Sequence, residues 1–160
     1  MSGNAIPIRS GELSFPFAKA PAISFFVPGI PATQGSKRHV GNGIMIDSNK
    51  RLPGWRSAVA YGAREAMDGR DPITGPVRLT VVFTLRRPKK HFRTGKHSHE
   101  LRPDAPVYCD TTPDLSKAVR AVEDAMKGIV WRDDCQVAEN GINRKLYGAQ
   151  PGAQITVEML

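Results

Sequence analysis

Apolar and polar residues alternate most regularly between residues 77 and 86. Apolar side chains occupy every second position, and polar ones fill the gaps apart from Val82. This period of two predicts a β-strand with one face turned toward the core. Residues 153–159 alternate in the same way, and the apolar run 23–27 leads into a Pro-Gly pair, so we expect a closing and an opening strand as well.

Two other stretches space their apolar residues three or four positions apart, which predicts helices. The first extends from about residue 55 to residue 67. The second carries four apolar residues at helical spacing: Leu115, Val119, Val122 and Met126. We expect Thr112 to cap this second helix, Pro113 to occupy its first position and Asp114 to lie in its first turn.

Strands and helices are interleaved along the chain, and no internal repeat is visible. This order fits a single small α/β (α+β) domain over residues 21–160, with a mixed β-sheet flanked by two main helices. The Asn42-Gly43 pair is a favoured turn dipeptide and predicts a hairpin before the first helix. Residues 1–20 mix small, polar and proline residues without a period, so we expect a disordered N-terminal arm.

The chain is strongly basic, with 23 Lys and Arg residues against 15 Asp and Glu residues and a formal charge of +8. Such a surplus favours polyanionic partners, because each cation that meets a phosphate releases counterions. Many small basic proteins use the same surplus only to stay soluble. Charge alone therefore leaves nucleic-acid binding and simple solubility as equal alternatives.

Cysteine content and apolar runs exclude several classes of protein. Cys109 and Cys135 are too few for a disulfide scaffold and lack the spacing of a zinc site. No apolar run approaches the roughly 20 residues of a membrane span, and the N-terminus has no apolar core of a signal peptide. We therefore expect a cytoplasmic protein with reduced thiols and no membrane partner.

Positive charge is concentrated between residues 86 and 99, where no acidic residue occurs. The cations of this segment are Arg86, Arg87, Lys89, Lys90, Arg93 and Lys96. One interpretation is an arm that binds the DNA backbone, with Phe92 as a stacking residue, and the other is a solvated loop. Lys37 and Arg38 in the predicted hairpin are a second candidate contact to phosphate, with a solvated turn as the alternative.

Three carboxylates stand out against this basic background: Asp114 at the start of the second predicted helix, and Asp133 and Asp134 in the loop after it. Taken singly, Asp114 suits a helix dipole and the pair suits a solvated turn. Together they offer the oxygen ligands that Mg²⁺ prefers, and a bound divalent cation promotes phosphodiester hydrolysis. Because a helix of about 14 residues is roughly 20 Å long, the two segments meet only if the chain folds back along the helix.

Arg120 shares a helical face with Lys117 and Asp124, because these residues lie three and four positions apart. One interpretation is that its guanidinium group binds a phosphate or stabilises charge that develops in a transition state. The alternative is an ion pair between Arg120 and Asp124 on a solvated helix.

Several of these motifs resemble the RusA family of Holliday junction resolvases. The segments Pro-Asp-Leu-Ser-Lys at 113–117 and Asp-Asp-Cys-Gln-Val at 133–137 are similar to that family's helix start and to its Asp-Asp-x-Gln-Val motif. The helix between them, with Asp-Ala-Met at 124–126, is similar to the family's Asp-Ala-Leu helix. Residues 26–29 and 34–37 also resemble the family's opening strand, so the resemblance extends over about residues 23 to 158.

The resemblance implies a RusA-like fold and a Mg²⁺-dependent endodeoxyribonuclease, with Mn²⁺ as an alternative metal. It implies that the enzyme resolves Holliday junctions by paired symmetric nicks, with branched DNA as its partner. It also implies a homodimer, because two matched nicks in a two-fold junction call for a two-fold enzyme. Two alternatives stay open: a non-catalytic branched-DNA-binding protein with the same fold, and a metal-dependent nuclease of other specificity.

Position by position, Asp114 and Asp134 match the family's catalytic, metal-binding aspartates. Asp133 is the neighbour of Asp134 and a secondary candidate for both roles. Arg120 stands where the family has a functional lysine, so the resemblance makes it a catalytic candidate with a changed donor geometry.

Two positions depart from the family pattern. Ser116 stands where a second aspartate is usual, so a neutral hydroxyl takes the place of one charge. Either Asp133 or a water supplies the missing ligand, or cleavage is impaired. Lys117 replaces the usual Asn and is a further candidate contact to a DNA phosphate.

Overall fold

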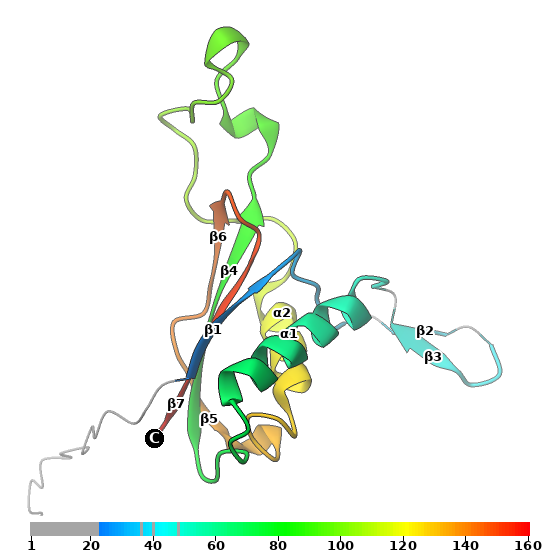
Figure 1. The fold of residues 1–160 in the computed structure, drawn as a ribbon. Helices are drawn as coiled ribbons and strands as arrows, with labels where there is room; N and C mark the ends of the chain where they lie inside the picture. The colour runs from blue at the N-terminus through cyan, green and yellow to red at the C-terminus, as the bar shows by residue number, and fades with distance from the viewer. Residues whose placement is uncertain (1–22, 36, 40, 48) are drawn as a thin grey trace, which may run out of the picture.

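The computed structural model describes residues 23–35, 37–39, 41–47 and 49–160. The predicted N-terminal arm, residues 1–20, lies outside these ranges. A five-stranded sheet forms one layer of the fold and two helices form the other (Figure 1). The expected fold class is thus confirmed: a single small α+β domain with a mixed sheet and two main helices.

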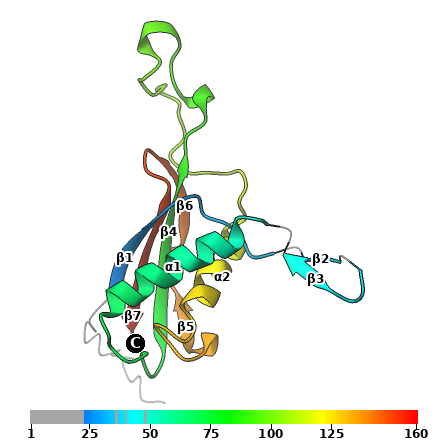
Figure 2. The same ribbon diagram turned by 45° about the vertical axis from the view of Figure 1, so that its right-hand side comes forward.

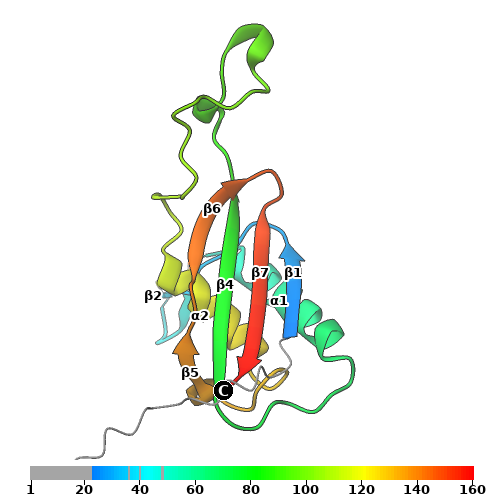
Figure 3. The same cartoon turned by 90° about the vertical axis from the view of Figure 1, so that its left-hand side faces the viewer.

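The sheet is mixed because its strands differ in direction. It consists of β1 (Ile23–Pro28), β7 (Gly152–Met159), β4 (Val77–Arg86), β5 (Val137–Asn140) and β6 (Arg144–Gly148). Strand β4 is central and pairs antiparallel with β7, which in turn pairs antiparallel with β1. Along its other edge β4 pairs parallel with β5 near its start and with β6 near its end, as Figure 3 shows.

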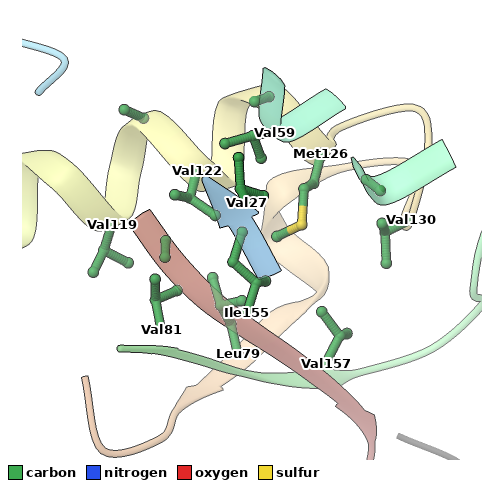
Figure 4. Packing of buried hydrophobic residues seen from close by; sticks show 14 of the residues in the cluster. Val27, Val59, Leu79, Val81, Val119, Val122, Met126, Val130, Ile155 and Val157 are labelled. Atoms are coloured by element: carbon green, nitrogen blue, oxygen red, sulfur yellow. The ribbon is translucent and has the colours of Figure 1, made fainter. Parts of the chain in front are cut away.

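Two helices cover one face of the sheet (Figures 2 and 3): α1 (Leu52–Met67) and α2 (Leu115–Met126). The alternating apolar residues of β4 are buried beneath them, as the period of two predicts. Figure 4 shows Val59 of α1 and Val122 and Met126 of α2 in this core with the side chains of the sheet. Burying each such side chain contributes about 1.5–3 kcal/mol. No helix in the described ranges is long and apolar enough to cross a membrane.

Helix α1 begins slightly earlier than predicted, at Leu52. The predicted cap of α2 was wrong: Asp114, not Thr112, is the N-cap residue, and Pro113 precedes the helix. The backbone of Asp114 is extended (φ −64°, ψ 130°), and its carboxylate accepts a hydrogen bond from Lys117 N. Aspartate caps a helix better than threonine does, and its charge suits the positive end of the helix dipole.

Two segments project from the two layers (Figure 1). The predicted hairpin is confirmed as β2 (Lys37–His39) and β3 (Met45–Asp47), with Asn42 in the left-handed region (φ 48°) at its turn. The second segment, which we call the basic arm, comprises residues 87–108 between β4 and α2. It carries the short 3₁₀ helices Lys89–His91 and Gly95–His97 and extends beyond the ends of β4 and β6.

Candidate functional site

Asp114 lies exposed at the amino end of α2, where two donors hold its carboxylate. Its Oδ1 atom accepts a hydrogen bond from Ser116 Oγ at 2.8 Å and another from Lys117 N at 3.2 Å. These donors, the Ser116 hydroxyl above all, hold the pKa of Asp114 below its usual range. Within the described residues Oδ2 has no hydrogen-bond or ion-pair partner, so an ionised oxygen is available to a ligand.

A groove opens beside Asp114 and is lined by both acidic and basic side chains. Arg120 and Glu123 contribute to it from α2, and Lys145 contributes from β6. A carboxylate with an available oxygen is a ligand for a divalent cation, and cations beside it attract a phosphate. The groove therefore combines the two kinds of group that phosphodiester hydrolysis needs.

Lys145 fixes the loop that leads into α2. Its Nζ atom donates hydrogen bonds to the carbonyl oxygens of Thr111 at 2.6 Å and Pro113 at 2.7 Å. Hydrogen bonds from an ammonium group are stronger than those between neutral groups, and the second of them ends on the residue before Asp114. Lys145 is therefore a positioning residue for Asp114. Sequence reasoning missed it because it lies in β6, a strand that no alternation predicts.

Asp133 and Asp134 lie beyond the opposite end of α2, in a segment that we call the acidic turn (residues 132–136). Asp133 caps the short 3₁₀ helix Asp134–Gln136. Asp134 Oδ1 accepts a hydrogen bond at 3.1 Å from the indole nitrogen of Trp131, a fully buried residue. Lys127 Nζ lies 3.2 Å from Asp133 Oδ2 and 3.7 Å from Asp134 Oδ2, so one cation faces both carboxylates.

Gln136 ties the acidic turn to the rest of the molecule. Its Oε1 atom accepts hydrogen bonds from Arg132 N at 2.8 Å and Asp133 N at 3.1 Å. Its Nε2 atom donates to the carbonyl oxygens of Ile73 at 2.8 Å and Gly75 at 2.9 Å, in the loop before β4. The amide thus uses its full capacity of two accepted and two donated bonds. Gln136 belongs to the Asp-Asp-Cys-Gln-Val motif, yet sequence reasoning gave it no role.

The structure does not bring Asp114 together with Asp133 and Asp134 within one chain. Helix α2 has 12 residues, so its two ends lie about 18 Å apart, with Asp114 at one end and the acidic turn after the other. The chain does fold back after the acidic turn, but it returns as β5 and places Asn140 on the groove beside Asp114. In the described ranges no three His, Cys, Asp or Glu side chains are grouped so that they could hold a metal ion.

Glu123 lies on α2 between the two acidic segments and was not singled out from the sequence. It is half-buried. Burial raises its pKa most, and the negative charges of Asp134 and Asp124 raise it further. The signal that could have found it is its spacing, two helical turns after Ser116 on the same face of α2. Because the negative charge of Glu123 is unfavourable in these surroundings, a cation bound nearby would stabilise it, and Glu123 is a candidate to lie beside a bound metal ion.

Arg120 lines the same groove as Asp114. Among the ion pairs of the described residues none joins Arg120 to Asp124, so the alternative of a helical ion pair was wrong. Lys117 lines an adjoining groove on which Asp114 also lies. Both cations are therefore close to the carboxylate at the amino end of α2.

The chain matches a known protein family over most of its length. The family described as "Endodeoxyribonuclease RusA" matches residues 27–158. This chain belongs to the RusA family. It is also 28% identical over 142 residues to the "Uncharacterized protein YqaN" of Bacillus subtilis (strain 168), a match that covers 84% of this chain and 94% of that protein.

Membership of the RusA family confirms the resemblance found in the motifs at 113–117 and 133–137, which both lie within the matched residues. The family is one of endodeoxyribonucleases, so the chain is assigned to the DNA nucleases. In this RusA-family chain Asp114 is exposed at its groove, and in the acidic turn Asp133 is exposed and Asp134 is partly exposed.

The predicted DNA-binding residues of this RusA-family chain fall in different places. Arg86, Arg87 and Lys89 line a groove at the base of the basic arm, while Lys90 is exposed outside that groove. Lys37 and Arg38 belong to β2, and their side chains lie outside what the structure describes. Of the predicted DNA-binding residues, Arg86, Arg87, Lys89 and Lys117 thus line grooves.

Proposed function

We propose that this RusA-family chain is a metal-dependent endonuclease that resolves Holliday junctions by paired symmetric nicks. The observation that carries the proposal is the exposed, ionised carboxylate of Asp114 in a groove that also holds Arg120 and Lys145. The carboxylate binds the metal and Arg120 attracts the phosphodiester, while Lys145 holds the loop that carries Asp114. A DNA substrate and the two unpaired thiols, Cys109 and Cys135, favour the cytoplasm as its location.

Mg²⁺, with Mn²⁺ as an alternative, is the metal that these ligands fit. Asp114 keeps Oδ2 unengaged by the described residues, and Mg²⁺ is often held by one or two carboxylates together with substrate oxygens and water. Asp134 is the second proposed ligand, with Asp133 beside it. The bound ion would activate water and offset charge on the scissile phosphate. Arg120 stabilises the charge that develops on the phosphate in the transition state.

A homodimer accounts for the separation of Asp114 and Asp134. The ends of the 12-residue α2 lie about 18 Å apart, and Asp114 and the acidic turn are not grouped closely enough in the described residues to hold an ion together. A two-fold axis across α2 sets the amino end of one copy's helix beside the carboxyl end of the other's. Asp114 of one copy then lies near Asp134 of the second copy, and the two resulting sites are related as two matched nicks require.

The predicted basic residues supply contacts to the DNA backbone: Lys37, Arg38, Arg86, Arg87, Lys89, Lys90 and Lys117. Each contact between a cation and a phosphate releases counterions, so binding of branched DNA should weaken steeply as the salt concentration rises. The basic arm extends beyond the sheet (Figure 1) and so presents its cations to a bulky substrate.

A labelled four-way junction, incubated with and without Mg²⁺, tests the proposal. We expect matched nicks in opposing strands with metal and none without it. Asp114→Asn and Asp134→Asn should reduce cleavage at least ~100-fold while junction binding persists. Asp124→Asn, on the same helix, is the matched control and should cleave normally. Full nicking by either site variant contradicts the assignment of the site.

Mixing the two inactive variants tests whether the sites are shared between copies. A mixed dimer of Asp114→Asn and Asp134→Asn chains contains one composite site with both carboxylates and one site with neither. We therefore expect the mixture to recover nicking of one strand, although each variant alone is inactive. No recovery, in a mixture shown by mass spectrometry to contain the mixed dimer, contradicts the shared site.

A non-catalytic junction-binding protein is the second candidate, and one contact favours it. Ser116 donates its hydroxyl hydrogen to Asp114 instead of adding a second carboxylate, which leaves the site with less negative charge than the family pattern gives it. This candidate predicts tight binding of the junction without cleavage at any Mg²⁺ or Mn²⁺ concentration. The same assay with flap and linear duplex substrates separates both candidates from a nuclease of other specificity.

A further inference from the structure

A second groove, of about 1000 Å³, lies at the base of the basic arm, where the arm leaves β4 and passes β6. The described residues that line it include three cations and three apolar or aromatic side chains: Arg86, Arg87, Lys89, Phe92, Leu101 and Tyr147. No acidic side chain is among the described residues of its lining. This composition suits a ligand that is flat and apolar in one part and anionic in another.

The ring of Tyr147 lines this groove and is held in place by neighbouring side chains. Its hydroxyl lies 3.3 Å from Thr111 Oγ1, so the two groups share a hydrogen bond. The guanidinium carbon of Arg87 lies 5.7 Å from the ring centre, and the ring of His91 meets it edge-on at 4.8 Å. These contacts hold the ring in place with Arg87 over one of its faces, so Tyr147 forms a rigid wall of the groove and lowers the entropic cost of placing a planar group beside it.

The arm that carries Phe92 is braced by its own hydrogen bonds. His91 is buried, and its carbonyl oxygen accepts a bond from Arg102 N at 3.0 Å. Phe92 and Leu101 face each other across the two sides of the arm as an isolated antiparallel bridge. The acid Glu100 is paired with Arg93 at 2.8 Å, so it leaves the positive charge at the groove uncompensated.

Shared lining residues link the arm groove to the candidate cleavage site through a third hollow. A third hollow shares Arg86 and Tyr147 with the arm groove, and it shares Asp114 with the groove along α2. Lys117 also lines the connecting hollow. A DNA strand that follows this path meets cations and aromatic rings at the arm and the Asp114 carboxylate further on.

We infer that the arm groove binds an unstacked base of branched DNA against Phe92, beside the Arg87–Tyr147 pair, while the strand continues toward Asp114. The inference rests on the proposed function. A base offers a flat apolar face to an aromatic ring, and its flanking phosphates suit Arg86 and Lys89. Bases stacked inside a continuous duplex do not expose such a face. The groove therefore favours DNA in which stacking is interrupted, as it is at the exchange point of a junction.

A junction with 2-aminopurine at the exchange point tests this inference directly. In metal-free buffer, where the proposed cleavage does not occur, we expect wild-type protein to change the fluorescence of this base. The same base placed in the middle of a duplex arm should not respond. An unchanged signal at the exchange point, on a junction shown to be saturated with protein, overturns the inference without use of any variant.

Substitution of Phe92 provides the second measurement. Phe92→Leu keeps an apolar side chain opposite Leu101 and removes the aromatic face, whereas Phe92→Tyr keeps that face. We expect Phe92→Leu to weaken junction binding at least about fivefold, the lower end of what stacking on an aromatic ring contributes, with no change for continuous duplex. Phe92→Tyr should bind like the wild type. Equal affinities of all three proteins for the junction overturn the inference.

Two neighbouring lysines provide a matched control for charge, because Lys89 lines the groove and Lys90 does not. Lys89→Ala should reduce the 2-aminopurine response, and Lys90→Ala should lower affinity for junction and duplex alike without changing that response. Equal responses of the two variants count against the groove. Failure of the proposed function looks different: the wild-type protein then neither cleaves the junction nor prefers it to duplex.

Discussion

Gln136→Met tests how the acidic turn is held in place. The substitution keeps a side chain of similar length and removes four hydrogen bonds, two to Arg132 and Asp133 and two to Ile73 and Gly75. A thioether is only a weak acceptor and donates nothing, so it replaces none of them adequately. We expect a less stable protein in which the carboxylates of the acidic turn no longer keep a single arrangement.

The expected loss of stability follows from the surroundings of these bonds. The bond from Gln136 to the Ile73 carbonyl is partly buried, whereas the other three are exposed and are readily replaced by water. A hydrogen bond contributes about 0.5–1.5 kcal/mol net, with exposed ones at the lower end. The loss is therefore about 2–3 kcal/mol, which lowers the melting temperature of a chain of this size by about 5–10 °C.

Thermal unfolding followed by circular dichroism measures this loss, and single-turnover cleavage of a saturated junction measures its effect on chemistry. The matched control is Gln154→Met on β7, which loses one exposed hydrogen bond, to Ser24. It should melt within about 3 °C of the wild type and cleave normally. A Gln136→Met protein that melts and cleaves like the wild type refutes the positioning role. A lower melting temperature with unchanged cleavage refutes the link between the acidic turn and the reaction.

Three further predictions concern the groove beside Asp114. Glu123→Gln should stabilise the protein at neutral pH, because burial raises the pKa of Glu123 and ionisation therefore disfavours the folded state. Urea unfolding should show that this gain in stability vanishes below the usual pKa of 4.5, and Glu65→Gln is the control. Ser116→Asp adds a carboxylate and should lower the Mg²⁺ concentration for half-maximal cleavage severalfold; an unchanged titration curve counts against a metal at Asp114. Lys145→Met frees the loop before Asp114 and should slow single-turnover cleavage at least ~10-fold with little loss of junction affinity. An equal loss of affinity would instead make Lys145 a phosphate contact.

The elements with periodic burial could be predicted from the sequence. Along β4 buried residues alternate with partly exposed ones, and α2 buries one helical face. The spacing of apolar residues therefore predicts both elements. Strands β5 and β6 were missed because none of their residues is buried and no alternation marks them. They are held by backbone pairing with β4, and pairing of this kind leaves little trace in the order of side chains.

The identities of the acidic residues could be predicted, but their arrangement could not. Asp114 and the acidic turn stand in recognisable motifs, whereas their separation depends on where the chain goes after α2. The positioning residues are harder still to find. Gln136 bonds to Ile73 across 63 positions of the sequence, and Lys145 bonds to Pro113 across 32. No local pattern contains either contact, because both depend on how distant segments pack.

The two acidic segments are ionised by different means, and the difference bears on the order of metal binding. Asp114 owes its lowered pKa to hydrogen bonds, the Ser116 hydroxyl first, and these leave Oδ2 unengaged within the described residues. Asp133 owes its lowered pKa to the backbone of Cys135 and then to Lys127, whose own pKa the acidic pair raises. A cation that approaches Asp114 displaces no other cation, whereas one that approaches the acidic turn competes with Lys127.

We therefore expect the metal to bind first at Asp114 and the acidic turn to join it only when Lys127 releases Asp134. In the proposed dimer this second step needs the neighbouring copy, so the complete site forms only where two chains meet. Asp114 and Asp134 together would hold an ion more firmly than Asp114 alone and would fix the position of the water that it activates. The separation of the carboxylates along α2 would thus restrict the proposed reaction to the proposed dimer, in which two sites would act on one junction and give paired nicks.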